Sequence, residues 1–397
     1  MVGDVLKTYR SLLAVPHARA FVLAGFVARL SISMRALGCV LMVSELAGSY
    51  GLAGAVTAAL LLGEAVAAPR LGRLVDRYGQ RRVLLLSLAV HSAGTLALVL
   101  SAQLSAPTWT LFATAALSGA AALPVGSLVR ARWSALVGNS PDLNAAFALE
   151  STLDELVFVL GPMLVSFLAL GVIPGAGLLG ALFLTVVGSL ALALQRRTEP
   201  ATAGSRDRSS TPAIRTPGLQ VLVMTFVATG MVFGALDVAM VAFASQVGSP
   251  AAAGVLLALV AAGSLVAGLA YGSRSWRWPL DRRFVASLIG LWAGTFLLVL
   301  APTVAIMAPA AALAGAAIAP TLIAGFVLVQ KLVPSDALTE GLNWVITGLG
   351  VGAAVGAWAA GLIADAAGGS TAFLVTSVAG GIAVFVAAHG QSRLRAS

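Results

Sequence analysis

Long apolar stretches without a single charge are the feature that most constrains this chain. Residues 83–129, 157–195 and 284–330 contain no Lys, Arg, Asp or Glu, and residues 216–273 contain only Asp237. Each stretch is longer than the roughly 18 apolar residues that mark one membrane-spanning helix, so each holds two crossings or most of two. A water-soluble domain is excluded, because 59% of the 397 residues are hydrophobic and only 10% are charged.

Turn-forming residues divide these stretches into single crossings. Gly, Pro and Ser interrupt the apolar sequence at four points, 101–108, 171–177, 247–252 and 300–303. Four more apolar runs lie near 20–44, 46–69, 338–364 and 366–390. We therefore predict an all-α integral membrane protein with twelve transmembrane helices.

The basic residues predict how these helices are oriented. Cytoplasmic loops retain Lys and Arg, whereas short translocated loops lack them. With both termini in the cytoplasm, all of the 24 basic residues except Arg29 and Arg35 of the first span lie on the cytoplasmic side. Topology therefore explains the net charge of +9, and a nucleic-acid partner is not expected. We predict a multi-pass protein of the cytoplasmic membrane.

Other common site chemistries are not expected. Cys39 is alone, and His17, His91 and His389 are scattered, so neither a disulfide nor a metal site is predicted. The first apolar run follows Lys7, which indicates a retained helix rather than a cleaved signal peptide. No P-loop or other cofactor motif is visible, so no cofactor is predicted.

A polar segment divides the twelve predicted helices into six and six. The sequence from 195 to 218 is rich in Ser, Thr, Pro and Arg and has no apolar period, which is typical of a flexible linker. We predict a first bundle over 1–195, a cytoplasmic linker over 196–217 and a second bundle over 218–397. When residue n of the first half is aligned with residue n + 200 of the second, several identical apolar residues and glycines match over two helices. This match favours two parallel repeats that rock about a central site.

Charge gathers between the second and third predicted helices, in GRLVDRYGQRR. The pattern resembles the loop signature of the major facilitator superfamily, G-x-x-x-D-R-x-G-x-R-R. Its positions are filled by Gly72, Asp76, Arg77, Gly79, Arg81 and Arg82. Gln80 stands where the family usually has a basic residue. The alternative is a basic loop that only sets the topology.

This resemblance implies a fold of two pseudo-symmetric six-helix bundles and a transporter that acts as a monomer. It also implies that Asp76 meets the second bundle when the cytoplasmic side is closed, as a latch. Glu150, near the cytoplasmic loops in the fifth span, is expected to complete that latch. Gly161-Pro162 resembles the core of the antiporter motif and predicts a hinge, with a packed kink as the alternative.

The fourth span departs from the family pattern. Residues 115–119 read AALSG where members often carry R-x-x-Q-G, so the intramembrane arginine linked to proton antiport is missing. This departure puts ordinary drug/proton coupling in doubt.

Ionisable residues within predicted spans are candidates for function, because each costs about 2.5–3.5 kcal/mol at mid-bilayer. They are Arg29, Arg35, Glu64, Glu150, Asp154, Glu155 and Asp237. Judged by depth, Arg29 is predicted to pair with Asp154 or Glu155, leaving another carboxyl such as Glu64 to bind and release a proton. The alternative is a permanently satisfied structural network.

Arg35 and Asp237 occupy nearly equivalent positions in the first and seventh spans. We predict a salt bridge between them that closes the outer gate. The alternative is that Asp237 alone binds a proton or a cationic substrate.

Aromatic and amide groups of the second half are candidates for the substrate cavity. They are Tyr271, Phe326, Asn343 and Trp344. Such a cavity suits an amphipathic organic molecule, although aromatic residues in membrane helices more often pack against neighbours or lipid.

The sequence thus predicts a secondary transporter, not an enzyme, working in the lipid bilayer by proton-coupled efflux of a small organic compound. An importer or uniporter on the same fold is the nearest alternative. A membrane enzyme using the carboxylates of the fifth span lacks a nucleophile or metal set beside them. A non-transporting sensor on the same scaffold is a third possibility.

Overall fold

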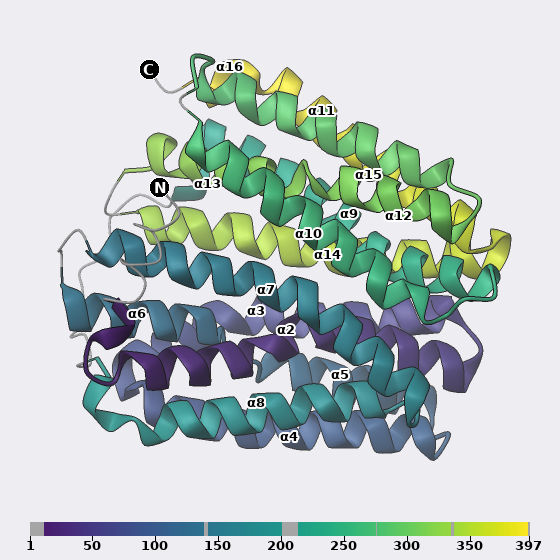
Figure 1. Ribbon diagram of the computed structural model, residues 1–397, viewed down its shortest axis with the longest axis horizontal. Coiled ribbons are helices and arrows are strands. Elements are labelled where there is room, and N and C mark those ends of the chain that lie inside the picture. The colour runs from purple at the N-terminus through teal and green to yellow at the C-terminus, as the bar shows by residue number, and fades with distance from the viewer. Residues whose placement is uncertain (1–11, 139–141, 201–212, 275, 335–336, 396–397) are drawn as a thin grey trace.

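The computed structural model describes residues 12–138, 142–200, 213–274, 276–334 and 337–395. Twelve helical segments in these residues are long and apolar enough to cross a membrane, which confirms the predicted number. They lie nearly side by side in two groups (Figure 1). The central part of the predicted linker, 201–212, lies outside the described residues.

The first group is built from α2 to α8. Its helices are α2 (Ala18–Ala47), α3 (Tyr50–Tyr78), α4 (Gln80–Gln103), α5 (Thr108–Ala120), α6 (Val125–Val137), α7 (Asp142–Gly171) and α8 (Ala176–Leu194). The second group consists of α9 (Pro217–Gln246), α10 (Ala252–Ser273), α11 (Leu280–Val299), α12 (Val304–Gly315), α13 (Ile318–Leu332), α14 (Leu338–Ala367), α15 (Gly369–His389) and α16 (Gln391–Leu394). Two 3-10 turns, η1 (Arg196–Thr198) and η2 (Ala213–Arg215), lie between the groups.

Two of the predicted spans are broken rather than continuous. The fourth span consists of α5 and α6, and α6 begins just after Pro124. The tenth span consists of α12 and α13, and Pro320 lies in the first turn of α13. A proline has no N–H to donate and fixes its own φ, so it fits best in the first turn of a helix, where its missing N–H would have no partner. The two breaks occur in equivalent spans of the two bundles.

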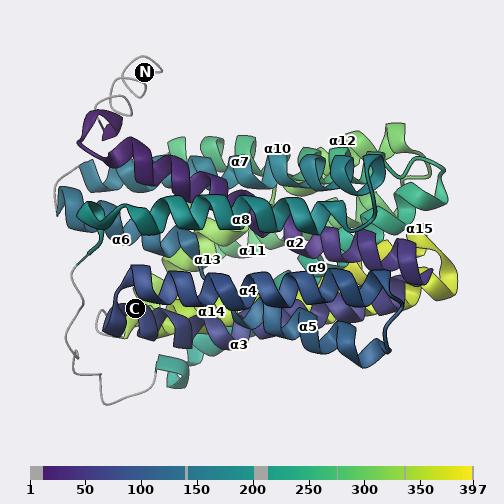
Figure 2. The same ribbon diagram turned by 90° about the horizontal axis from the view of Figure 1, so that it is seen from below.

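The molecule has two ends that differ in how the bundles meet. Residue 12, the described parts of the linker (196–200 and 213–217) and residue 395 lie at one end, here called the linker end, and the short turns such as 48–49 and 247–251 lie at the far end (Figures 1 and 2). At the far end one buried apolar cluster draws residues from both bundles, including 34–43 of α2 and 235–244 of α9.

At the linker end each bundle has its own core. One cluster belongs to the first bundle and includes Phe21 and Trp133, whose rings meet edge to face at 5.0 Å. The other belongs to the second bundle and includes Phe226 and Phe284. Within the described part of the chain, no hydrogen bond or ion pair joins the bundles at this end. The bundles are therefore closed on each other at the far end.

Candidate functional site

A charged network lies inside the first bundle, toward the linker end. Arg29 of α2 donates from Nη1 to Asp154 Oδ1 at 2.7 Å and from Nη2 to Glu150 Oε2, both on α7. Arg29 and Glu150 are almost fully buried, with 1% and 0% of their side chains exposed. The predicted pairing of Arg29 with Asp154 is confirmed, and its second partner is Glu150 rather than Glu155.

Two residues of α6 complete this network: Arg130, which the sequence places near Glu150, and Trp133, which the sequence did not indicate. Arg130 Nη2 lies 2.6 Å from Asp154 Oδ2, and Trp133 Nε1 donates to Glu150 Oε1 at 2.8 Å. Residues 130 and 133 are three apart on one helix, and 150 and 154 are four apart on another, so each pair shares a helix face. This spacing is the sequence signal that could have predicted that the two helix faces meet. We call Arg29, Arg130, Trp133, Glu150 and Asp154 the Arg29 network.

The Arg29 network is balanced in charge and in hydrogen bonds. Each of the four carboxylate oxygens of Glu150 and Asp154 has its own donor. Buried ion pairs are stable only when their remaining hydrogen-bonding groups are also satisfied. This arrangement fits the structural alternative for these carboxylates. Glu150 pairs within the first bundle, and its role in the cytoplasmic latch stays a prediction.

A second ion pair lies deeper in the first bundle. Arg35 Nη2 is 3.2 Å from Glu64 Oε1 and 3.1 Å from Glu64 Oε2, joining α2 to α3. The side chain of Arg35 is 9% exposed and that of Glu64 is 32% exposed. The predicted salt bridge of Arg35 with Asp237 is wrong for this conformation, and Glu64 does not belong to the cluster around Arg29.

Helix geometry explains that correction. Arg29 and Arg35 are six residues apart on α2, so at 3.6 residues per turn they project from different faces. The residue number tells how deep a side chain lies along its helix. The rotation of the helix about its own axis determines which neighbouring helix that side chain faces, and so which residue it pairs with. Asp237 on α9 is half-buried, and within the described residues it has no ion pair or side-chain hydrogen bond.

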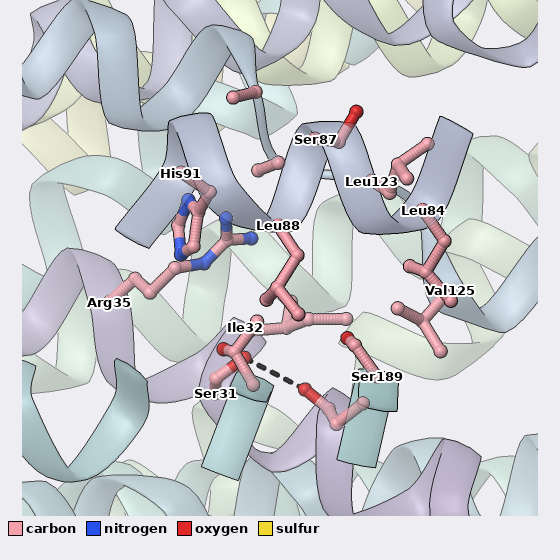
Figure 3. A pocket seen from close by; sticks show the side chains of 14 residues that line it. Ser31, Ile32, Arg35, Leu84, Ser87, Leu88, His91, Leu123, Val125 and Ser189 are labelled. Atoms are coloured by element: carbon pink, nitrogen blue, oxygen red, sulfur yellow. Dashed lines mark hydrogen bonds between the residues drawn. The ribbon is translucent and has the colours of Figure 1, made fainter. Parts of the chain in front are cut away.

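A small cavity lies beside Arg35, between α2, α4, α8 and residues 121–125 (Figure 3). Its lining includes Arg35, His91 and Ser87. His91 Nδ1 is 2.8 Å from the Ser118 carbonyl oxygen, and Arg35 Nε is buried without a partner among the described residues. The cavity holds about 20 Å³, enough for a water molecule and too small for an organic substrate.

The loop signature adopts the expected tight reversal. Gly79 ends α3 with φ 88° and ψ 154°, a conformation that a residue with a Cβ rarely adopts, and α4 begins at the next residue. The side chains of Asp76, Arg77 and Arg82 are exposed, and a Cβ at Gly72 would meet nothing within 4 Å. None of these signature side chains contacts the second bundle in an ion pair or hydrogen bond that involves described residues. The latch role of Asp76 stays a prediction.

The start of the linker is held against the first bundle. Glu199 accepts a hydrogen bond from the Arg81 backbone N–H at 2.8 Å. Buried Arg132 donates to Thr198 Oγ1 at 2.8 Å and to Gln80 Oε1 at 2.9 Å. Residues 196–199 are therefore docked rather than flexible, and Gln80, which departs from the family signature, has a structural partner.

The Gly161-Pro162 pair lies inside the unbroken helix α7. A Cβ at position 161 would overlap Ser33 Oγ of α2, and Ser33 donates to the Val157 carbonyl oxygen at 2.7 Å. Gly161 thus lets two helices approach closely, as the packed-kink alternative expects. Its role as a hinge stays a prediction.

The four substrate-cavity candidates do not share one site. The ring of Tyr271 packs tilted against that of Trp276 at 4.8 Å, at the linker end of α10. Phe326 packs on Phe226 at 5.5 Å in the core of the second bundle. Asn343 and Trp344 are exposed on the linker half of α14. Tyr271 is buried and Phe326 is half-buried, so both rings pack against neighbouring aromatic residues, and the role of all four residues in substrate binding stays a prediction.

Comparison with known proteins places this geometry in a family. The model for the Major Facilitator Superfamily matches residues 21–248 and 221–392. A search of curated proteins found no match. Among solved structures, a crystal structure of the nucleoside transporter NupG has a TM-score of 0.72, 15% sequence identity and coverage of 96% of this chain and 100% of its own.

Two other solved structures share the fold. A bacterial homologue of the iron transporter ferroportin in the inward-facing state has a TM-score of 0.73 at 16% identity, covering 96% of this chain and 99% of its own. The human organic anion transporter MFSD10 has a TM-score of 0.65 at 17% identity, covering 94% and 100%. At these identities the likeness concerns the fold alone.

Proposed function

Because the chain belongs to the major facilitator superfamily, whose members transport small molecules, we propose that it moves a small organic compound by alternating access in exchange for protons. The solved structures with this fold carry cargo as different as nucleosides, iron and organic anions. The fold therefore does not select the substrate, and the proposal rests on the side chains of this chain.

The observation that carries the proposal is the Arg35–Glu64 pair. Among the described residues Glu64 has Arg35 as its single polar partner and is a third exposed. Asp154, equally exposed, is held by two arginines, and Glu150 is fully buried and bonded through both oxygens. Protonation of Glu64 removes the attraction that holds Arg35, whose Nε has no hydrogen-bond partner among the described residues. A carboxyl with one partner and access to solvent changes its proton occupancy at lower cost than a fully compensated buried one.

Asp237 is the proposed second carboxylate of the cycle. It lies on α9, the helix of the second bundle that shares the far-end core with α2. A half-buried carboxyl that has no ionic partner in the described part of the chain is a candidate to bind a proton or to receive Arg35 when Glu64 is protonated. Asp154 and Glu155 are weaker candidates, since the Arg29 network compensates Asp154.

We further propose that the linker end faces the cytoplasm of a cell bounded by the cytoplasmic membrane. The basic residues outside the spans support this orientation, as the positive-inside rule requires. In this conformation the far end is closed, so the substrate site communicates with the cytoplasm. Exposed Asn343 and Trp344 supply one amide and one aromatic face, which suits an amphipathic organic substrate.

The test uses the purified monomer in liposomes that contain a pH-sensitive dye. A thermal-shift screen against a chemically diverse library first supplies a ligand, because a compound that binds only the folded protein raises its apparent stability. That ligand, added with a pH gradient, is expected to drive proton movement in the parent protein. The Glu64→Gln variant is expected to bind the ligand and lose proton movement.

Glu45→Gln is the matched control, since Glu45 is an exposed carboxyl at the far end of α2. It is expected to keep both binding and proton movement. Ligand flux without any proton movement in the parent would reject coupling and leave a uniporter. Proton movement that survives in Glu64→Gln would reject Glu64 as the coupling group.

A further inference from the structure

One aspartate fastens the two bundles together at the far end. Asp365 of α14 accepts hydrogen bonds from the Tyr50 backbone N–H at 2.7 Å, from the Gly51 backbone N–H at 2.8 Å and from Ser49 Oγ at 2.6 Å. These residues form the N-terminal turn of α3, on the other bundle. In the part of the chain that the structure describes, they are the hydrogen bonds that join the bundles.

The chemistry of this contact is that of a helix cap supplied by another domain. The first N–H groups of a helix have no partner within it, and the helix dipole places partial positive charge there. The carboxylate of Asp365 satisfies two of these N–H groups and brings a full negative charge to the dipole. Ser49 meanwhile caps its own helix by accepting from the Leu52 N–H at 3.0 Å.

Close backbone packing holds the carboxylate at this position. Any Cβ at Gly54 would overlap the Ala357 carbonyl oxygen, and any Cβ at Gly361 would overlap the Tyr50 carbonyl oxygen. A Cβ at Gly51 would lie 2.9 Å from Asp365 Oδ2. α3 and α14 therefore touch backbone to backbone at the far end, and separating them breaks the cap.

The same local geometry recurs at the opposite end of the same pair of helices. α3 ends as Asp76-Arg77-Tyr78-Gly79 and α14 ends as Asp365-Ala366-Ala367-Gly368. Both glycines have positive φ, at 88° for Gly79 and 89° for Gly368, and ψ of 154° and 163°. In both cases the next helix starts at once. Each helix thus carries an aspartate three residues before the glycine that ends it.

The two aspartates differ in whether they cap the start of a helix in the other bundle. Asp365 holds the start of α3, whereas exposed Asp76 faces no polar partner among the described residues. The start of α14 is uncapped by its own N-cap residue, since Ala337 has only a methyl group. We propose that Asp365 is a far-end latch, and that it alternates with Asp76, so that closing one end of the α3–α14 pair releases the cap at the other.

This inference rests on the alternating access of the proposed function, and its test uses neither substrate nor proton gradient. Spin labels on a Cys39→Ala background report the separation of the bundles, because Cys39 is the chain's one cysteine. Labels at exposed Gln103 and Thr303 span the far end. Labels at exposed Ser134 and Ser273 span the linker end. Distance distributions are measured in lipid nanodiscs by pulsed electron resonance.

Asp365→Ala is expected to raise the ratio of long to short Gln103–Thr303 distances by about fivefold to tenfold, the range that loss of a helix cap produces. Asp365→Asn keeps one acceptor oxygen and is expected to give a smaller rise in the same direction. The Ser134–Ser273 distances are expected to shorten in the same samples. Gly51→Ala keeps the Asp365 carboxylate but displaces it. It is expected to shift the Gln103–Thr303 and Ser134–Ser273 distances in the same directions as the Asp365 variants do. Glu45→Gln, an exposed carboxyl at the same end, is expected to leave both unchanged.

Adding Asp76→Asn to Asp365→Ala is expected to return the ratio toward the parent value, because the second cap is then lost as well. Unchanged distances in both the Asp365 variants and Gly51→Ala would overturn the latch. A further rise in the double variant would overturn the alternation with Asp76. If the distance shifts are observed but the parent protein shows no proton-coupled transport, the proposed function is rejected and the far-end latch is retained.

Discussion

The Arg29 guanidinium on α2 lies 2.7 Å from the Asp154 carboxylate on α7, and both side chains are tied to α6 through other members of the Arg29 network. Three helices of one bundle are therefore linked by charge at the end where the bundles have separate cores. This link stabilises the first bundle as a unit.

Removing the cation of this network is expected to destabilise the protein severely. Arg29→Met leaves Glu150 buried with a charge and no cation, which costs about 3–5 kcal/mol. Thermal unfolding of the purified protein measures the loss. Adding Glu150→Gln is expected to restore part of it, whereas Arg73→Gln, at an exposed position, is expected to stay within about 0.5 kcal/mol of the parent. Equal stability of Arg29→Met and the parent would contradict the buried network.

Glu64 and Asp237 are expected to respond oppositely to neutralisation. Glu64→Gln leaves Arg35 without its carboxylate partner and is expected to lower the unfolding temperature. Asp237→Asn removes a half-buried charge that has no described ionic partner, so the unfolding temperature is expected to stay or rise. Thermal unfolding of both variants in one detergent makes the comparison. A clear loss in Asp237→Asn would show that Asp237 has a partner in the resting protein.

Gly161→Ala distinguishes packing from hinge motion. The added methyl overlaps Ser33 Oγ and is expected to cost about 1–3 kcal/mol. Gly171→Ala on the same helix meets nothing within 4 Å and is expected to be neutral. Ser33→Ala combined with Gly161→Ala is expected to recover part of the unfolding temperature. Transport that stays absent after this recovery would favour the hinge.

Trp344→Ala tests the substrate wall. Its side chain is 41% exposed on α14, so its loss is expected to leave thermal stability near the parent value. The dissociation constant for a ligand found by thermal shift is expected to rise about tenfold, as loss of an aromatic anchor does. Trp292→Ala is the control, because Trp292 is 43% exposed on α11, away from α14. Equal weakening in both variants would remove Trp344 from the site.

The number of transmembrane helices could be predicted from the sequence, because in lipid a long uncharged apolar run satisfies its backbone hydrogen bonds by forming a helix. It also placed Arg29 beside Asp154, since depth in the membrane follows from residue number. It did not find Glu64 beside Arg35, because that contact depends on how α2 and α3 are rotated about their axes. Trp133 was missed since an indole N–H looks apolar in a hydropathy pattern.

Tyr271 and Phe326 show a related limit. An aromatic residue has the same sequence signature whether its ring packs in a core or faces a solute. The ring of Phe326 packs tilted against Phe226, and that of Tyr271 packs tilted against Trp276, so both rings are used in packing. Asp365 was missed for another reason: its partners are backbone N–H groups, which every residue but proline carries and no motif marks.

The shared apolar cluster at the far end makes the protein's conformational balance sensitive to heat and cold. Parting the bundles there replaces contacts among residues such as Met42 and Phe243 with hydrated surface. Hydration of apolar surface becomes less unfavourable on cooling, with a large change in heat capacity. A cold membrane should therefore contain more molecules parted at this end than a warm one.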